Sequence, residues 1–275
     1  MRKSAAILGF LATLFLSQPG LAELRVVVFD TGQGQAILLR RGSQGVLIDT
    51  GVAPYADTLL RRIEAHGVAD LDYLFLTHLH PDHAGGYFRI RERFPKAAII
   101  GNGHPLAARG FSSIERLYDD ALRNDPRWRV MRAGGELIWQ GVSIKVLWPE
   151  SFASQDFNRH SLVLMIALGK SRLLVMGDAG DYVERRLLER GVVQGPVSVL
   201  VTGHHGIART ADPQFLARVR PKVAVIPASW KVPSFQPDDA VAARLAAASG
   251  RLLRTDIDGE ICLELAADNE TPEDC

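Results

Sequence analysis

The most constraining feature of this sequence is a group of four side chains that can bind metal ions, all within six residues. They are His78, His80, Asp82 and His83. Imidazole and carboxylate groups are ligands that suit Zn²⁺, Mn²⁺ or iron. The apolar segment 71–76 is typical of a buried strand, and if that strand continues, His78 and His80 point the same way. Pro81 then forces a turn that directs Asp82 and His83 toward a second point. The sequence therefore predicts two adjacent metal ions at the end of a strand.

Composition limits the chain to an ordinary globular protein. Of its 275 residues, 47% are hydrophobic and 23% are charged, which is enough to bury a core and excludes a disordered chain. The formal charge of +1 gives no overall attraction to nucleic acid or acidic lipid. Two cysteines are too few for a disulfide-built scaffold or a cysteine-rich zinc module. In an oxidising compartment Cys262 and Cys275 can form one disulfide, and two free thiols are the alternative.

The first 22 residues have the three parts of a secretory signal peptide. Arg2 and Lys3 precede the apolar run 5–16, and the small residues Gly20 and Ala22 mark a cleavage site. The run is shorter than the roughly 20 residues that span a bilayer, which disfavours an uncleaved anchor. We therefore expect a signal peptide at 1–22 and a mature domain at 23–275. That domain is expected to be exported, periplasmic or extracellular, and without a membrane anchor.

Strands and helices alternate along the rest of the chain without a Pro-, Gly- or Ser-rich linker. Apolar, β-branched runs predict strands at 24–29, 36–40, 45–49, 71–76, 137–139, 142–147, 161–168, 172–176, 197–202, 222–226 and 261–265. Helical spacing of apolar residues predicts helices between Pro54 and Gly67 and at 112–124, 181–190, 213–219 and 238–248. This pattern fits two sheets packed together and covered by helices, as one domain of the α/β sandwich type.

The pattern His-x-His-x-Asp-His-x-Gly-Gly at 78–86 resembles the metal-binding signature of the metallo-β-lactamase superfamily. Further blocks, in the same order along the chain, are similar to the metallohydrolase domain of ComEC-type competence proteins. They lie at 29–38, 47–51, 158–164, 175–179, 204–206 and 254–259. The resemblance implies a single-domain, four-layer αββα fold with the metal ions at the edge between the two sheets.

The resemblance also implies which residues hold the ions. His78 and His80 are expected at the first ion, Asp82 and His83 at the second, Asp178 between both, and His205 at the second in preference to His204. Because adjacent side chains diverge, the remaining histidine, His204, is expected to face the substrate and donate a proton to the leaving group.

Two further positions leave alternatives open. Asn158 stands where many members have a third histidine for the first ion, so it is expected to bind that ion weakly, act through water or position the substrate. Asp49 is expected to orient a ligand histidine, and a plain turn at the end of a strand is the alternative. His160 is interpreted as a surface or supporting residue and not as a ligand.

The expected chemistry is hydrolysis by solvent. Two divalent ions, Zn²⁺ or Mn²⁺, lower the pKa of a bridging water toward neutrality and bind the oxygens of a phosphoryl or acyl group. Asp82 can bind metal and also accept a hydrogen bond from that bridging hydroxide. The chain has no Gly-x-Ser-x-Gly motif and no histidine near Cys262 in sequence, which disfavours a covalent route.

Three functions are compatible with these residues. The preferred one is hydrolysis of a phosphodiester or other small anionic substrate, with DNA as a candidate. A basic stretch supports it, because ten Arg and Lys outnumber five acids between Arg89 and Arg132, although a solvated surface with local ion pairs is an alternative. The second is hydrolysis of lactones or thioesters, since lactonases of the superfamily also have a bridging Asp. The third is a non-catalytic binding module, which is disfavoured because every expected metal ligand is retained except at the position of Asn158.

Some positions depart from the ComEC-like pattern. Gln35 stands where an Asp is usual, Val201 replaces a Lys, and 207–208 replaces the Ser that usually follows the Gly of His-His-Gly. A charge and a hydroxyl that would face phosphate are therefore missing, which weakens the nuclease interpretation without affecting the metal ligands.

Overall fold

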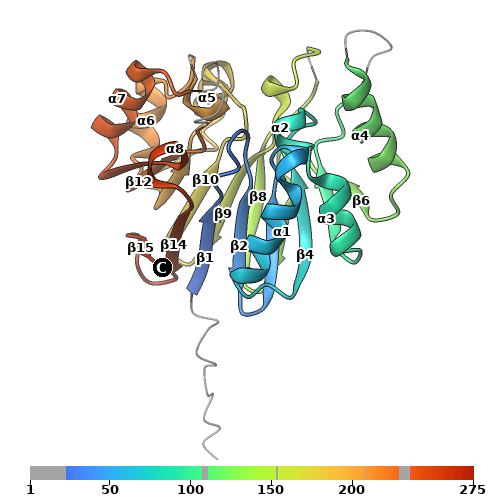
Figure 1. The fold of residues 1–275 in the computed structure, drawn as a ribbon. Coiled ribbons are helices and arrows are strands. Elements are labelled where there is room, and N and C mark those ends of the chain that lie inside the picture. The colour runs from blue at the N-terminus through green and yellow to red at the C-terminus, as the bar shows by residue number, and fades with distance from the viewer. Residues whose placement is uncertain (1–22, 107–110, 153, 208, 229–235) are drawn as a thin grey trace, which may run out of the picture.

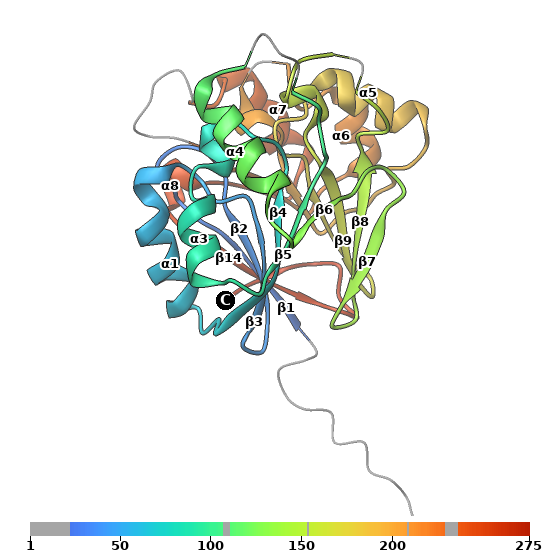
Figure 2. The same cartoon turned by 90° about the vertical axis from the view of Figure 1, so that its right-hand side faces the viewer.

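Two β-sheets lie face to face in the computed structural model, and helices cover the outer face of each sheet (Figures 1 and 2). The structure describes residues 23–106, 111–152, 154–207, 209–228 and 236–275. The expected signal peptide at 1–22 lies outside these residues. The four layers and the single domain confirm the fold predicted from the sequence.

The first sheet has the strand order β15-β14-β1-β2-β3-β4-β5-β6. Its strands are β1 (Glu23–Val28), β2 (Ile37–Arg41), β3 (Gln44–Ile48), β4 (Asp70–Leu76), β5 (Ala98–Gly101), β6 (Trp128–Val130), β14 (Ile261–Ala266) and β15 (Glu273–Asp274). The helices of this half are α1 (Ala56–Ala65), α2 (Pro81–Ala84), α3 (Tyr87–Arg93) and α4 (Ser113–Arg123), and α8 (Thr255–Asp258) precedes β14.

The second sheet has the strand order β13-β12-β11-β10-β9-β8-β7. Its strands are β7 (Glu136–Trp139), β8 (Val142–Trp148), β9 (Val163–Leu168), β10 (Ser171–Val175), β11 (Val199–Val201), β12 (Val223–Ile226) and β13 (Arg251–Arg254). It is covered by α5 (Asp181–Glu189), α6 (Pro213–Val219) and α7 (Asp239–Ala248), and Figure 2 shows these helices on the side opposite α1 and α3.

Alternating side chains of each central strand enter two different cores. In β1, Val26 and Val28 pack between the sheets, whereas Val27 packs under the helices of the first half. In β10, Val175 packs between the sheets and Leu174 packs under α5 and α6. Strands buried on both faces have continuous apolar sequences, which is why the sequence marks them so clearly.

Parallel strands bring the functional segments to one edge. β3 to β6 run parallel in the first sheet, and β10 to β13 run parallel in the second. The carboxyl ends of parallel strands open on the same side. α2 follows β4 and α5 follows β10, and both lie at the top edge in Figure 1.

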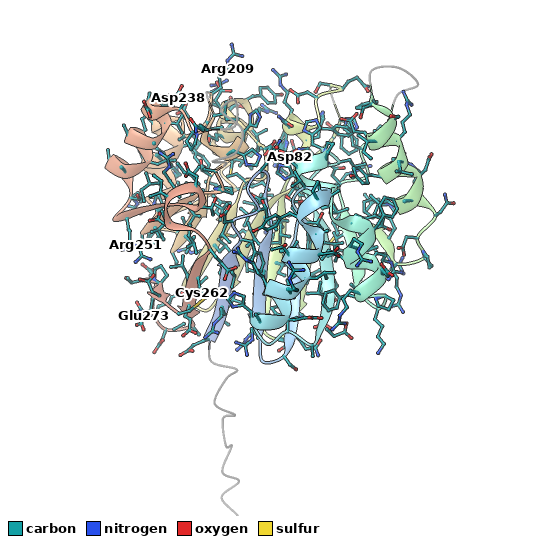
Figure 3. All side chains as sticks on the ribbon, viewed as in Figure 1. Asp82, Arg209, Asp238, Arg251, Cys262 and Glu273 are labelled. Atoms are coloured by element: carbon teal, nitrogen blue, oxygen red, sulfur yellow. A yellow bond between two sulfur atoms is a disulfide. The ribbon has the colours of Figure 1, made fainter. Side chains whose placement is uncertain are left out.

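A disulfide joins Cys262 of β14 to Cys275 at the end of the chain. This resolves the alternative left open by the sequence, because neither cysteine is a free thiol. Figure 3 places Cys262 toward the end of the sheet opposite Asp82, so the disulfide supports the C-terminal hairpin and not the candidate site. Within the described ranges, no helix is both long enough and apolar enough to cross a membrane.

Candidate metal centre

The loop after β4 brings His78 and His80 together. β4 ends at Leu76, so the strand itself does not continue through the two histidines. Their side chains nevertheless converge, with His78 Nε2 3.0 Å from His80 Nδ1. The hydroxyl oxygens of Thr77 and Ser161 lie 3.1 and 3.2 Å from His78 Nδ1 and hold its ring from behind. The Nε2 atom is thereby left to face the site.

The short helix α2 places the second pair. Pro81 occupies its first turn, where the missing N–H costs no hydrogen bond, and Asp82 and His83 follow at once. His83 is fully buried, and its Nδ1 lies 2.7 Å from Asp49 Oδ2. Asp49 also accepts hydrogen bonds from the Thr77 backbone N–H at 2.7 Å and the Gln35 side chain at 2.8 Å. Asp49 therefore fixes the His83 ring, as the first of its two interpretations expected.

Asp178, directly after β10 and Gly177, lies between the two pairs. Its Oδ2 is 3.6 Å from His78 Nε2, and its Oδ1 is 3.0 Å from His83 Nε2. The Ser161 hydroxyl accepts a hydrogen bond from the Asp178 backbone N–H at 3.1 Å. Asp178 Oδ1 is buried and also lies 3.4 Å from His205 Nε2. One carboxylate thus offers an oxygen to each side.

The turn His204–Gly206 separates its two histidines. Both have left-handed backbone, with φ of 47° at His204 and 54° at His205, a conformation that non-glycine residues adopt rarely and mostly at functional sites. His205 is buried, its Nδ1 is 2.8 Å from the Pro227 carbonyl oxygen, and its Nε2 is 3.4 Å from Asp82 Oδ2. His204 is one-third exposed, and its Nε2 is 3.9 Å from Asp178 Oδ2.

The predicted ligands thus form two groups of potential donor atoms. His78, His80 and Asp178 form one group, and Asp82, His83 and His205 form the other, with the ligand atoms of each within 4.8 Å of one another. The two facing atoms His83 Nε2 and His205 Nε2 are 3.3 Å apart, an arrangement that suits a shared cation. Asp178 Oδ1 faces both of these nitrogen atoms, at 3.0 and 3.4 Å, and fits the same role. The donors are therefore appropriate for divalent metal ions.

Electrostatics in this centre favour added positive charge. Burial alone would raise the pKa of the Asp178 carboxyl, but the surrounding imidazoles, with His83 the strongest, hold it well below its usual range. Burial alone would lower the pKa of His83, but the neighbouring carboxylates, with Asp178 the strongest, raise it well above its usual range. The carboxylates therefore stay ionised and draw positive charge to the ring nitrogens.

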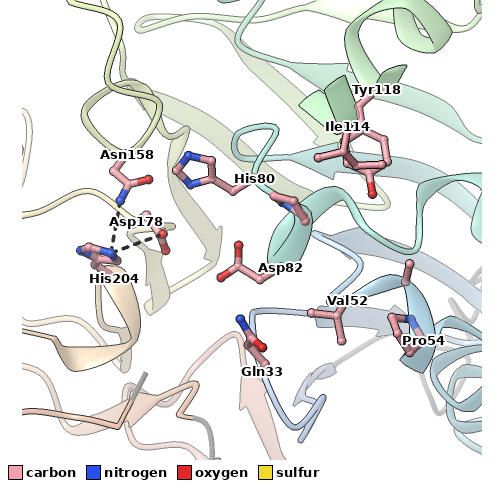
Figure 4. Close-up of a pocket in the computed structure, with 12 residues that line it drawn as sticks. Gln33, Val52, Pro54, His80, Asp82, Ile114, Tyr118, Asn158, Asp178 and His204 are labelled. Atoms are coloured by element: carbon pink, nitrogen blue, oxygen red, sulfur yellow. Dashed lines mark hydrogen bonds and ion pairs between the residues drawn. The ribbon is translucent and has the colours of Figure 1, made fainter. Parts of the chain in front are cut away.

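Asn158 and His160 share a 3-10 turn at 158–160 but face different surroundings. Asn158 Nδ2 lies 3.2 Å from His204 Nε2, and Figure 4 shows this pair beside Asp178. His160 is buried, so its interpretation as a surface residue is wrong. It packs against His104 with ring centroids 5.0 Å apart, and its Nε2 is 3.2 Å from the Ser154 hydroxyl. It supports the turn and lies outside both donor groups.

A cavity of about 620 Å³ opens over the centre. Its floor includes Asp82, Asp178 and His204, and Figure 4 shows an apolar wall opposite Asn158. That wall contains Val52, Pro54, Ile114 and Tyr118. A substrate with a polar reacting group and a flat or apolar neighbouring group fits this division.

Four of the ten basic residues in the predicted stretch form ion pairs with acids among the described residues. Arg89 binds Asp57 and Glu92, Arg91 binds Asp125, Arg93 binds Glu64, and Arg123 binds Asp119. Arg109 lies outside the described residues. These ion pairs support the alternative interpretation of the stretch as a solvated surface.

Sequence reasoning missed several supporting residues. Gln35 and Thr77 hold Asp49, and Ser161 holds both His78 and Asp178. Small polar residues at strand ends carry no distinctive signal, because the same residues are common in ordinary turns.

Comparisons with known proteins agree with this geometry. A family model described as the metallo-beta-lactamase superfamily matches residues 29–230. Competence protein ComA of Neisseria gonorrhoeae is 32% identical over 87% of this chain and 32% of its own length. A UPF0173 metal-dependent hydrolase of Aeropyrum pernix is 26% identical over 69% of this chain and 77% of its own. The metallo-beta-lactamase fold protein YhfI of Bacillus subtilis superposes with a TM-score of 0.57 at 13% identity, covering 89% of this chain and all of its own. The chain spans about a third of the length of the competence relative.

Proposed function

The chain belongs to the metallo-beta-lactamase superfamily and is a metal-dependent hydrolase of that family, and we propose that it hydrolyses phosphodiesters, with DNA as a candidate substrate. The observation that carries the proposal is Asp178. Its carboxylate lies between two groups of nitrogen and oxygen donors at the floor of an open cavity. Such a centre suits the charged oxygens of a phosphodiester. The competence relative makes DNA the polymer to test.

We assign two divalent ions, Zn²⁺ or Mn²⁺, to these donors. His78 and His80 would hold the first, Asp82, His83 and His205 the second, and Asp178 both. When bound, the ions supply Lewis acidity for phosphoryl oxygens and lower the pKa of water.

Two side chains are assigned to the reaction itself. Asp82 faces the cavity with one carboxylate oxygen 3.4 Å from His205 Nε2, so it can orient an attacking water by accepting its hydrogen bond. His204 lines the same cavity and is one-third exposed, so it can reach the leaving oxygen and give it a proton. Asn158, beside His204, is assigned to hold that ring or the substrate.

We also propose that the protein is exported, through a signal peptide at 1–22 and a mature domain at 23–275. The disulfide between Cys262 and Cys275 supports an oxidising compartment. Expression of the whole chain in a bacterium with a periplasm should yield a mature protein that begins at Glu23. N-terminal sequencing of the periplasmic fraction tests this, and a protein that keeps Met1 in the cytoplasm would contradict it.

The reaction is tested with the mature chain loaded separately with Mn²⁺ and Zn²⁺ and given bis(p-nitrophenyl) phosphate, a lactone and a thioester. We expect metal-dependent diester cleavage that Asp178→Ala abolishes and that Asp57→Ala, a change on the exposed face of α1, leaves intact. Cleavage of the lactone or thioester alone would assign the enzyme to the acyl hydrolases, which the apolar wall of the cavity also suits. Absence of cleavage with either metal would instead indicate a non-catalytic binding module.

A further inference from the structure

A second cavity, of about 190 Å³, adjoins the metal centre. It shares Asn158, Asp178 and His204 with the large cavity, so the two meet at the centre. Beyond these residues it is lined by Arg159, Arg209, Tyr182 and the start of α5, and we call it the arginine cavity. None of these three side chains was assigned a role from the sequence.

The charges in the arginine cavity leave one cation unmatched. Arg159 is paired with Asp156 at 3.5 Å, and Asp181 is paired with Arg185 at 3.0 Å. Among the residues that the structure describes, the Arg209 guanidinium makes no ion pair or hydrogen bond. Figure 3 places Arg209 at the same end of the molecule as Asp82. The cavity therefore offers a free guanidinium, the group that binds phosphate in a fork of two hydrogen bonds.

The backbone that carries Arg209 is held by hydrogen bonds from α5. Its carbonyl oxygen accepts a hydrogen bond from the Asp181 N–H at 2.7 Å, although Arg209 itself has a strained φ of 69°. The two side-chain oxygens of Glu184 accept hydrogen bonds from the backbone N–H groups of Ala211 and Asp212, each at 2.8 Å. These hydrogen bonds fix the loop that carries Arg209 beside the arginine cavity.

The other wall of the arginine cavity is flat. The Arg159 guanidinium lies 4.7 Å from the centre of the Tyr182 ring, and that tyrosine is 37% exposed. A stacked arginine keeps its outer N–H groups free while its plane stays fixed.

We propose that the arginine cavity binds the phosphate next to the scissile one, with Arg209 as its specificity-determining contact. This rests on the proposed phosphodiester activity and narrows it to substrates with at least two neighbouring phosphates, that is, a nucleic acid strand or a short oligonucleotide. In such a substrate the scissile phosphate lies over the metal centre, and a nucleobase can pack on the apolar wall of the large cavity.

The test uses two pairs of chromogenic esters that differ only by a second phosphate. One pair is thymidine 5′-(p-nitrophenyl phosphate) with and without a 3′-phosphate, and the other is thymidine 3′-(p-nitrophenyl phosphate) with and without a 5′-phosphate. Both are needed because the direction of the strand across the cavities is an outcome of the test. In at least one pair we expect kcat/KM to be about tenfold higher for the doubly phosphorylated ester.

Arg209→Gln should reduce that ratio to about 1, and Arg209→Lys should keep part of it. Arg186→Gln is the matched control, because it removes the same charge from the exposed side of α5. Thermal unfolding of each variant shows whether it is folded. Equal kcat/KM for all four esters, or a ratio that Arg209→Gln leaves unchanged, would overturn the proposal that the arginine cavity binds a second phosphate. Either result would leave the proposed phosphodiesterase activity intact. Failure to cleave any ester would instead overturn the proposed function.

Discussion

His83 uses its two ring nitrogens for different tasks. Nδ1 is held by Asp49 at 2.7 Å, and Nε2 faces Asp178 at 3.0 Å. A carboxylate behind a ligand histidine fixes the tautomer and makes the ring a better donor.

We therefore expect Asp49→Asn to weaken metal binding by about 10- to 100-fold, since the amide keeps the shape but not the charge. Competition with a chelating dye measures the affinity directly. Asp57→Asn, which removes an acid from the surface, should bind metal as the parent does, and an equal loss in both variants would refute a specific role for Asp49.

His204 should show its role through the leaving group. A proton donor is needed most when the departing oxygen is a strong base, as in a nucleotide, and least when it is p-nitrophenolate. His204→Gln should slow cleavage of a dinucleotide by about 100-fold or more and slow bis(p-nitrophenyl) phosphate much less. A uniform loss on both substrates, measured as kcat, would assign His204 to another task.

Glu184 makes stability depend on pH. Burial raises its pKa from 4.5 to about 7 in the folded protein. The folded protein therefore holds this proton more tightly than the unfolded chain, and its contribution to stability decreases by about 3 kcal/mol as the pH rises from about 4.5 to 7.

Glu184→Gln does not titrate, so its stability relative to wild type should improve by up to about 3 kcal/mol between pH 5 and pH 8. Urea unfolding of the metal-free proteins at the two pH values measures the difference. If the difference in unfolding free energy between Glu184→Gln and wild type is the same at pH 5 and pH 8, the raised pKa of the buried Glu184 carboxyl is contradicted.

At the scale of elements, the sequence predicted the metal ligands better than the path of the backbone that carries them. The cluster at 78–83 is local, so spacing alone revealed it. β4 ends at Leu76, and the loop that follows it bends the two imidazoles together. The short strands β5 and β6 were missed, whereas the equally short β11 and β12 were found because they lie within the longer apolar runs 197–202 and 222–226.

Close backbone approach fixes α2 against the loop before β2. Gly34 has a φ of 87°, and a Cβ on it would lie 1.9 Å from the Asp82 carbonyl oxygen. Gly34→Ala should therefore displace Asp82 and reduce the bound metal measured by elemental analysis. Gly191→Ala is the matched control, because Gly191 also has a positive φ of 64° but no atom within 4 Å of the added Cβ. Full metal content in Gly34→Ala would contradict this coupling.

At the scale of the molecule, the centre exists only where both sheets end. β4 of the first sheet supplies one half through the loop and α2, and β10 and β11 of the second lead to Asp178 and His205. Nothing in local spacing relates residues 82, 178 and 205, so their union was expected only from the resemblance to a known fold. The resemblance did not point to Arg209 either, because the position of Arg209 depends on the loop that Glu184 holds.

We propose that these two halves form one two-ion centre for diester hydrolysis. The most direct measurement is a titration of the metal-free mature chain with Mn²⁺, followed by the rate of bis(p-nitrophenyl) phosphate cleavage. We expect the cleavage rate to rise with added Mn²⁺ and to stop rising at two equivalents per chain. A rate that saturates at one equivalent, or the absence of cleavage at every metal content, would contradict it.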